Sequence, residues 1–243
     1  MKEKTVTEAI AYRRSVRVFK HDKEIDSEKV KDCIKNATLS ATSSNMQLWE
    51  FYHITNSEVL EKMTKACLGQ NAVKTAKQLV VVVVRKDLWR KRRVSNIEFL
   101  KQLFGNKPVE QYTKREKFAI NYYQKLIPTI YFDFLGILGW LKYIIFWCLG
   151  LFKPIYRQVR QSDMRIVAHK SAGLAAQNFM ISMAAINYDT CPMEGSDTIL
   201  IKKILDLPIG AEINMVIGCG VRDEKGIYAP QFRIPFEEVY FEI

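Results

Sequence analysis

The sequence predicts an α+β domain that carries a helical insertion, and three patterns lead to this prediction. Leu79 to Val84 is an unbroken, mostly β-branched apolar run, which is typical of a strand covered on both faces. Asp163 to Ile186 is rich in alanine and methionine and predicts a long, closely packed helix. Phe134 to Phe152 is the most apolar stretch and has a single charged residue. It lies in an insertion at about 86–162, inside one domain that spans 1–243.

The chain before the insertion alternates helical and strand patterns. Asp26 is a good N-cap, and Ser27 and Glu28 favour the first turn of the helix that follows it. In order, the patterns predict a helix at 5–13, a helix that begins after Asp26, a polar loop at 40–47, a strand at 49–54 and a helix at 58–67.

The chain after the insertion predicts, beyond the long helix, one shorter helix and one strand. Ser196 is expected to cap a helix that runs to about Leu207, where Pro208 ends it. Residues 213–221 predict a strand. Its Gly-Cys-Gly sequence at 218–220 does not fit a dinucleotide-binding fingerprint, because the third glycine is missing and a charged turn follows instead of a helix.

The composition is that of a folded globular protein, with 48% hydrophobic and 26% charged residues. The formal net charge of +11 suits an anionic partner, but outside Arg13–Arg17 and Arg85–Arg93 the basic residues are scattered, so they predict no nucleic-acid-binding stripe. The five cysteines form no Cys-x-x-Cys pair and the three histidines no His-x-x-x-His pair, so neither a disulfide framework nor a metal site is predicted. The N-terminus has no signal-peptide pattern, and we expect a cytoplasmic protein.

The apolar stretch at 134–152 is long enough to be considered as a transmembrane segment. Three glycines interrupt it and two prolines bracket it: Gly136, Gly139, Gly150, Pro128 and Pro154. We therefore expect a helical hairpin instead of a span. Two placements stay open, which are burial at an oligomer interface and peripheral insertion into a membrane surface.

The polar motif with the clearest chemistry is Arg13-Arg14-Ser15-Val16-Arg17. A guanidinium carries a fixed fork of donors and stays charged when partly desolvated, so this cluster suits a phosphate monoester. A basic turn on a basic surface is the alternative.

Four separated motifs resemble those of the FMN-dependent nitroreductase family, and they occur in the family's order. The matches are Arg13-Arg14-Ser15-Val16-Arg17-Val18-Phe19; Ser43-Ser44-Asn45-Met46-Gln47-Leu48-Trp49; the helix Gly173 to Asn178 that leads to Cys191-Pro192-Met193-Glu194-Gly195; and Gly218 to Gly220 with the downstream Arg233-Ile234-Pro235. The resemblance covers the chain except about 86–162. Leu48 departs from the family pattern, in which proline is common at this place.

The resemblance implies a nitroreductase-like fold, with a mostly antiparallel central sheet flanked by helices, and FMN as the cofactor. The residues that it assigns to the FMN phosphate are Arg13, Arg14, Ser15, Arg17 and Arg233. The residues that it assigns to the rest of the cofactor are Ser43, Ser44, Asn45, Gln47, Asn71, Pro192, Met193, Glu194 and Gly195. A backbone N–H at Glu194 and Gly195 would serve flavin N5, near the start of a helix whose dipole favours the anionic reduced flavin.

The resemblance also implies the reaction and the assembly. NAD(P)H would pass a hydride through flavin N5 to a small acceptor, such as a nitroaromatic or a quinone, without a metal. In the family two chains intertwine and each FMN lies at the dimer interface, so the Ser43–Gln47 loop would serve the flavin bound mainly by the partner chain. The insertion would correspond to the family's lid over the flavin. Two alternatives stay open: a specialised flavin enzyme of the same fold, such as a reductive dehalogenase, and a flavin-binding scaffold at a membrane surface.

Overall fold

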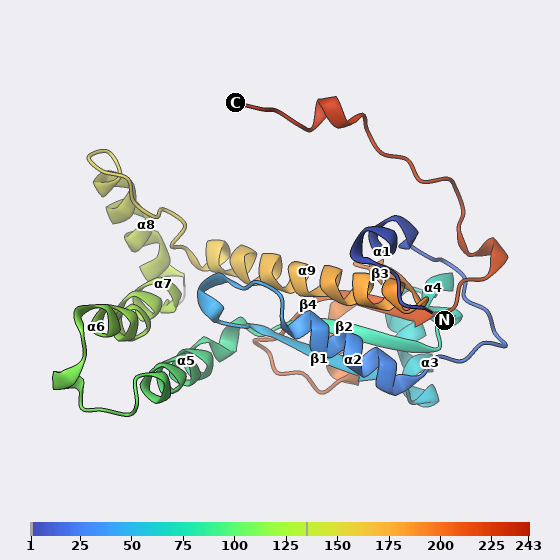
Figure 1. Cartoon of the computed structure of the whole chain (residues 1–243), viewed down its shortest axis with the longest axis horizontal. Helices are drawn as coiled ribbons and strands as arrows, with labels where there is room; N and C mark the ends of the chain where they lie inside the picture. The colour runs from blue at the N-terminus through green and yellow to red at the C-terminus, as the bar shows by residue number, and fades with distance from the viewer. Residues whose placement is uncertain (1, 135) are drawn as a thin grey trace.

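The computed structural model describes residues 2–134 and 136–243, which form a four-stranded sheet with helices on both faces (Figure 1). The strands are β1 (Trp49–Ile54), β2 (Gln78–Val84), β3 (Asp189–Met193) and β4 (Glu212–Gly220), and they lie in the order β1-β2-β4-β3 with every pairing antiparallel. The α+β class and the antiparallel sheet are therefore confirmed. The three strands that the sequence predicts are confirmed to within one residue.

The helices cover the sheet and build the insertion. Their bounds are α1 (Val6–Tyr12), α2 (Ser27–Thr38), α3 (Ser57–Ala66), α4 (Asn71–Lys74), α5 (Trp89–Leu103), α6 (Lys114–Asn121), α7 (Ile127–Tyr131), α8 (Ile137–Leu149), α9 (Gln161–Ala185) and α10 (Thr198–Ile204). A π-helical turn at Tyr122–Leu126 joins α6 to α7. The helices predicted at 5–13, after Asp26, at 58–67 and at 163–186 are confirmed as α1, α2, α3 and α9.

Strand β2 separates two apolar cores, and all seven of its residues are buried. Because successive side chains of a strand point to opposite faces, its even-numbered residues pack in one core with α2 and α9. Its odd-numbered residues pack in the other core with α3, α4 and α10. A strand covered on both faces is what the β-branched run predicts.

Strand β3 is not predicted from the sequence, because Pro192 lies in its middle. Proline cannot donate a hydrogen bond to a neighbouring strand, so it is tolerated only where one side of the strand is free. β3 is the edge strand of the sheet: it pairs with β4 on one side, and on the other it makes only an isolated bridge between Thr190 and Ser15, which leaves the position of Pro192 free. The edge position therefore reconciles the proline with the strand.

The helix caps confirm one prediction and correct another. The carboxylate of Asp26 accepts a hydrogen bond from the backbone N–H of Glu28 at 2.9 Å, as expected of an N-cap. Ser196 is not a cap: α10 begins one residue later than expected, after Asp197, whose carboxylate accepts from the N–H of Leu200 at 2.9 Å. The charged acceptor serves the positive end of the helix, and the Ser196 hydroxyl is buried without a hydrogen-bond partner.

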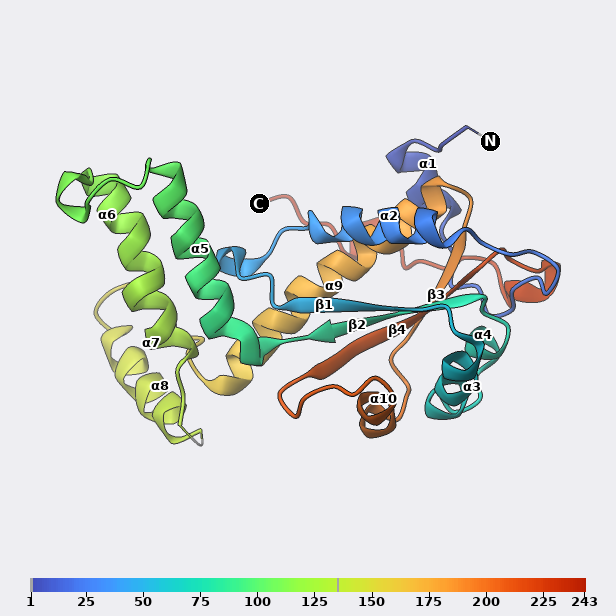
Figure 2. The same cartoon turned by 90° about the horizontal axis from the view of Figure 1, so that it is seen from below.

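The insertion extends beyond one end of the sheet, where α6 and α7 follow each other end to end beside α5, and α8 comes after them (Figure 2). The predicted hairpin within 134–152 is wrong, since this stretch contributes one helix, α8. Gly136 has a φ of 83° and turns the chain into α8, and Gly139 lies inside the helix without breaking it. In the part of the chain that the structure describes, no helix has both the length and the apolar character needed to cross a membrane.

Candidate functional site

Four arginines from opposite ends of the chain line one cavity of about 310 Å³. Arg13, Arg14 and Arg17 come from the segment that follows α1, and Arg233 comes from the C-terminal segment. Ser15 lines the same cavity. The structure therefore brings together all five residues that the resemblance assigns to a phosphate group.

The arginine segment is held by its backbone. The N–H of Val16 donates to the carbonyl of Thr190 at 3.1 Å, and the N–H of Arg17 donates to the carbonyl of Gly226 at 2.7 Å. The N–H of Phe19 donates to the hydroxyl of Thr75 at 3.0 Å, and its ring is buried. These contacts fix the backbone of the segment against β3, the turn that follows β4 and the end of α4.

The cavity is a concentration of unpaired positive charge. None of the ion pairs in the described residues includes Arg13, Arg14, Arg17 or Arg233. Arg14 donates to the backbone carbonyl of Ala229 at 2.7 Å, which fixes it without neutralising it. Burial, followed by the charges of Arg233 and Arg14, lowers the pKa of Arg13. Gathered cations without a carboxylate favour an anionic ligand.

Glu194 and Gly195 extend β3 and are exposed. The side-chain amide of Gln70 donates to the Gly195 carbonyl at 2.7 Å, and the N–H of Asp197 donates to the carbonyl of Ala66 at 2.8 Å. A methyl group placed on Gly195 would meet no atom within 4 Å. The backbone here is thus anchored on one side and open on the other, as the close approach of a flat ring requires.

Asn71 links this backbone to the arginine cavity. Its side-chain amide donates to the hydroxyl of Tyr228 at 3.2 Å, and Tyr228 lines the cavity. Gln70, its neighbour in sequence, holds Gly195. Tyr228 belongs to no sequence motif, and it reaches the site only through the course of the C-terminal segment.

Pro192 and Met193 support the site from β3 and do not reach into it. Met193 is buried and Pro192 is half-buried in the edge strand. Cys191, which precedes them, is buried; burial raises the pKa of its thiol, and the nearby Arg17 and Arg13 oppose that rise. A thiol held in this way is unsuited to act as a nucleophile.

The Ser43–Gln47 loop is not part of this cluster. It precedes β1 at the end of the sheet where Trp49 pairs with Val84, whereas Thr190, which binds the arginine segment, pairs with Cys219 opposite Gln78. The seven residues of β2 lie between these ends, a distance of about 20 Å. Figure 2 shows the turn before β1 beside the insertion, at the other end of the molecule from α1 and α4.

The loop has an unusual backbone. Ser44, Asn45 and Gln47 have φ values of 53°, 49° and 48°, which are uncommon for residues other than glycine and often mark functional sites. The Ser44 and Tyr122 hydroxyls lie 2.6 Å apart, and the Asn45 side-chain amide donates to the Asn96 carbonyl oxygen at 2.9 Å. The insertion therefore holds the loop in this conformation.

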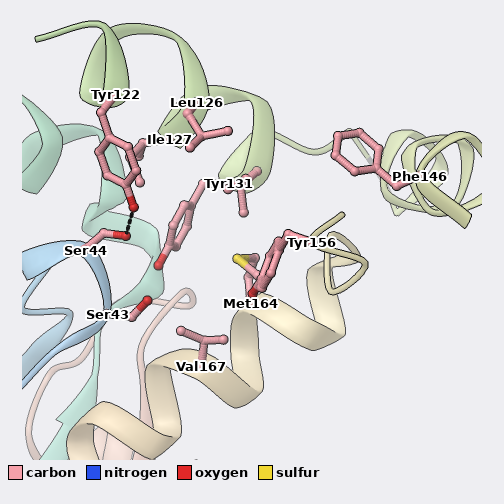
Figure 3. Close-up of a pocket in the computed structure, with 11 residues that line it drawn as sticks. Ser43, Ser44, Tyr122, Leu126, Ile127, Tyr131, Phe146, Tyr156, Met164 and Val167 are labelled. Carbon is pink, nitrogen blue, oxygen red and sulfur yellow. Dashed lines mark hydrogen bonds between the residues drawn. The ribbon is translucent and has the colours of Figure 1, made fainter. Parts of the chain in front are cut away.

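A second cavity of about 230 Å³ lies between this loop, the insertion and α9 (Figure 3). Ser43 and Ser44 form its polar side, and the rest of its lining is largely apolar and aromatic. Tyr131 and Tyr156 point into it, and burial raises the pKa of Tyr131 to about 12. This cavity could receive a flat apolar molecule.

Comparison with known proteins decides the family. The model of the nitroreductase family matches residues 10–221, which include three of the four motifs in full and the glycines of the fourth. The chain belongs to the nitroreductase family. This family consists of oxidoreductases, so the chain is assigned to that class.

Individual relatives of this nitroreductase-family chain are distant but align over most of its length. MhqN of Bacillus subtilis, provisionally named an NAD(P)H nitroreductase, is 22% identical over 234 residues, which are 96% of each protein. The structure of YdfN from Bacillus subtilis has a TM-score of 0.73 at 22% identity and covers 98% of both chains. A protein from Exiguobacterium sibiricum, solved in complex with FMN, has a TM-score of 0.68 at 19% identity, with 100% of this chain and 99% of that chain covered. At these identities the solved structures establish the nitroreductase fold.

Proposed function

We propose that the chain is an FMN-dependent oxidoreductase that uses NAD(P)H to reduce a small acceptor such as a nitroaromatic or a quinone. The observation that carries this proposal is the cavity with four unpaired arginines, joined through Asn71 and Gln70 to the open backbone at Gly195. An FMN-bound structural neighbour and relatives named for NAD(P)H support the choice of cofactor and reductant.

The residues fit the three chemical parts of FMN. Arg13, Arg17 and Arg233 would hold the phosphate, because forked cations without a counter-ion pair well with its oxygens. Asn71 offers an exposed neutral amide to the polar edge of the ring. The backbone at Glu194 and Gly195 offers N–H groups where nothing obstructs a flat ring.

When bound, FMN supplies the hydride-transfer chemistry at its N5 atom. The chain positions that atom. The side-chain amide of Gln70 binds the Gly195 carbonyl and fixes the peptide that follows it. The backbone N–H of Asp197 donates to the Ala66 carbonyl and holds the next residues in place. Because the backbone is anchored directly after Gly195, it can present the N–H groups of Glu194 and Gly195 with little reorganisation.

We infer that the working enzyme is a homodimer, because the predicted FMN ligands lie at two ends of the sheet. One chain cannot bring the Ser43–Gln47 loop to its own arginine cavity without crossing the length of β2. A second copy can supply the loop. The insertion would then serve as a lid, since Tyr123 donates to the carbonyl of Ser44 at 3.0 Å and moves with the loop.

The test is the visible absorbance spectrum of the purified protein, incubated with FMN and passed through a desalting column. We expect a yellow protein that bleaches when NADH or NADPH is added without oxygen and recovers its colour with a quinone. A colourless protein contradicts the proposal. If dithionite reduces the bound flavin but neither nicotinamide does, FMN stands as the cofactor and NAD(P)H is rejected as the reductant. This result is expected of the specialised flavin enzyme.

A further inference from the structure

The outward face of α8 consists entirely of apolar residues. The exposed residues at helical spacing on this face are Ile137, Trp140, Leu141, Ile144, Ile145 and Cys148, and the exposed apolar residues that flank it are Phe134, Trp147, Leu149, Leu151 and Phe152. Soluble proteins seldom expose an apolar surface this continuous without a partner.

The orientation of α8 is fixed by its inward face. The Lys142 ammonium, its only charge, donates to the carbonyls of Phe132 at 2.6 Å and Thr129 at 3.0 Å and so caps the end of α7. The N–H of Gly139 donates to Asp133 at 2.8 Å, and the Arg160 guanidinium lies 4.7 Å from the Tyr143 ring centre. The helix thus turns its polar contacts inward and its apolar side chains to solvent.

The charge of the chain is concentrated around this helix. Residues 86–162 contain 15 Lys or Arg and 5 Asp or Glu, a net of +10 out of the formal +11 of the whole chain. Of these 15 cations, only Lys107 and Arg160 form an ion pair within the residues that the structure describes. Arg90 lies 5.9 Å from the ring of Phe132, near the start of α8, and Lys153 follows its end.

We propose that α8 docks in the plane of an anionic lipid bilayer. Its 13 residues span about 20 Å, less than the roughly 30 Å of a hydrocarbon core, so the helix lies along the surface. The outward apolar face enters the boundary between headgroups and acyl chains. The free cations of the insertion bind the lipid phosphates.

Charge favours a bilayer over a second copy as the occupant of this face. A symmetric contact through α8 would bring two insertions of net charge +10 against each other. An anionic surface neutralises the same charges and covers the same apolar residues.

The experiment is co-sedimentation of the full chain with phosphatidylcholine vesicles that contain either no or 30% phosphatidylglycerol. We expect a partition coefficient at least about tenfold higher on the anionic vesicles, which falls at least about tenfold between 50 and 500 mM NaCl. Trp140 and Trp147 are exposed in the free protein, so their fluorescence should shift to the blue on binding.

The variant Ile144→Ser with Ile145→Ser removes apolar area from the docking face while leaving both tryptophans. It should lower the partition coefficient at least about tenfold. The matched control is Ile199→Ser with Ile209→Ser, which alters two exposed isoleucines outside the insertion and should bind as the wild type does. Circular dichroism and the thermal midpoint verify that both variants fold.

Three results would overturn the proposal: no sedimentation of the wild type with anionic vesicles, equal sedimentation with neutral ones, or undiminished binding of the Ile144 and Ile145 variant. A lower molar mass of that variant in light scattering, without vesicle binding by the wild type, would assign the face to a second copy and overturn it as well.

Discussion

Arg13 and Arg233 lie at opposite ends of the sequence and line the same cavity. Neither forms an ion pair with a carboxylate in the described residues, and burial, followed by the charges of Arg233 and Arg14, lowers the pKa of Arg13. A basic turn would leave its arginines in water, apart from each other. The half-buried Arg13, which the neighbouring arginines repel, favours the phosphate interpretation over the basic turn.

The double variant Arg13→Ala with Arg17→Ala tests that interpretation. Each arginine would contribute a charge-assisted contact of about 1.5–3 kcal/mol, so the dissociation constant for FMN should rise at least about 100-fold. Flavin fluorescence titration measures it. The exposed pair Lys29→Ala with Lys62→Ala removes the same charge elsewhere and should leave FMN binding unchanged. If the two double variants bind FMN with equal affinity, the basic-turn interpretation of the arginines is favoured instead.

Single residues also show where sequence reasoning stops. Arginine clusters are visible in sequence because the residue type carries the chemistry. The positive φ angles of Ser44, Asn45 and Gln47 are invisible, because all three residues are compatible with an ordinary loop. Tyr228 is equally hidden, since its contact with Asn71 depends on the path of the last residues.

At the scale of elements, Gly220 and Gly195 serve different purposes: the first allows close packing, and the second leaves room for a ligand. On β4, a methyl group on Gly220 would lie 2.8 Å from the buried Phe19 ring. On the extension of β3, a methyl group on Gly195 would meet nothing within 4 Å. Gly220 thus admits Phe19 of the arginine segment, and Gly195 leaves room for a ligand.

We therefore expect opposite outcomes from two alanine substitutions. Gly220→Ala should lower the free energy of unfolding by about 1–3 kcal/mol, because Phe19 must move in a packed core. Gly195→Ala should leave stability nearly unchanged and weaken FMN binding at least about tenfold. Urea unfolding followed by circular dichroism, together with flavin titration, separates them. A stable Gly220→Ala or a Gly195→Ala with normal FMN affinity would contradict the assignment of that glycine.

The corner between α8 and α9 depends on the ion pair of Asp163 with Arg160. Asp163 accepts from the Arg160 backbone N–H at 3.0 Å and from its guanidinium at 3.0 and 3.1 Å, and these hydrogen bonds lower the pKa of Asp163. A carboxyl group with a depressed pKa stabilises the fold above its ordinary pKa and loses that contribution as the pH falls through the folded-state value.

Asp163→Asn should accordingly lower the free energy of unfolding by about 1 kcal/mol at neutral pH, the usual cost of losing a helix-start contact. The difference from the wild type should narrow as the pH falls below about 4, because the wild-type carboxyl becomes protonated. Urea midpoints across this range measure it. Asp32→Asn, which breaks an exposed pair with Lys35, serves as a control with little change at any pH. A difference that persists in acid would show that the ionised form is not responsible.

The elements themselves were largely predictable. β2 follows from its β-branched run, and α9 from its length and periodicity. β3 was missed because edge position, which tolerates Pro192, is a property of the sheet and not of the segment. The hairpin at 134–152 was wrong because Gly139 serves close packing against Asp133 and the start of α9 instead of a turn.

At the scale of the molecule, the two ends of the sheet differ in chemistry. One end holds the arginine cavity, and the other holds the Ser43–Gln47 loop and the charged insertion. The motifs predicted both groups of residues, but only the family resemblance, which assigns the loop to the partner chain's flavin, implied their separation, since sequence order does not reveal which end of a strand a loop occupies. That separation makes the dimer a requirement of the proposed flavin site.

The C-terminal segment gives the dimer a measurable signature. Every residue from Tyr228 to Ile243 is exposed, although the segment is rich in large apolar side chains, and it leads away from the body (Figure 1). The apolar residues beyond Arg233 are Ile234, Phe236, Val239, Tyr240, Phe241 and Ile243. Such an extension gains stability when another surface covers it, and the second copy that the proposed flavin site requires would supply one.

Deletion of residues 236–243 should therefore weaken the dimer while Arg233 and the fold remain. Burial of several aromatic and aliphatic side chains contributes well over 1 kcal/mol, so the dimer dissociation constant should rise at least about tenfold. Light scattering across a dilution series should find the wild type near twice the chain mass of 28.2 kDa. On dilution, the truncated chain should fall toward a single chain mass at a higher protein concentration than the wild type does. Ile199→Ser with Ile209→Ser, which removes exposed apolar area elsewhere, should behave as the wild type. If truncated and full-length chains dissociate alike, another surface, such as α9, must carry the contact between copies.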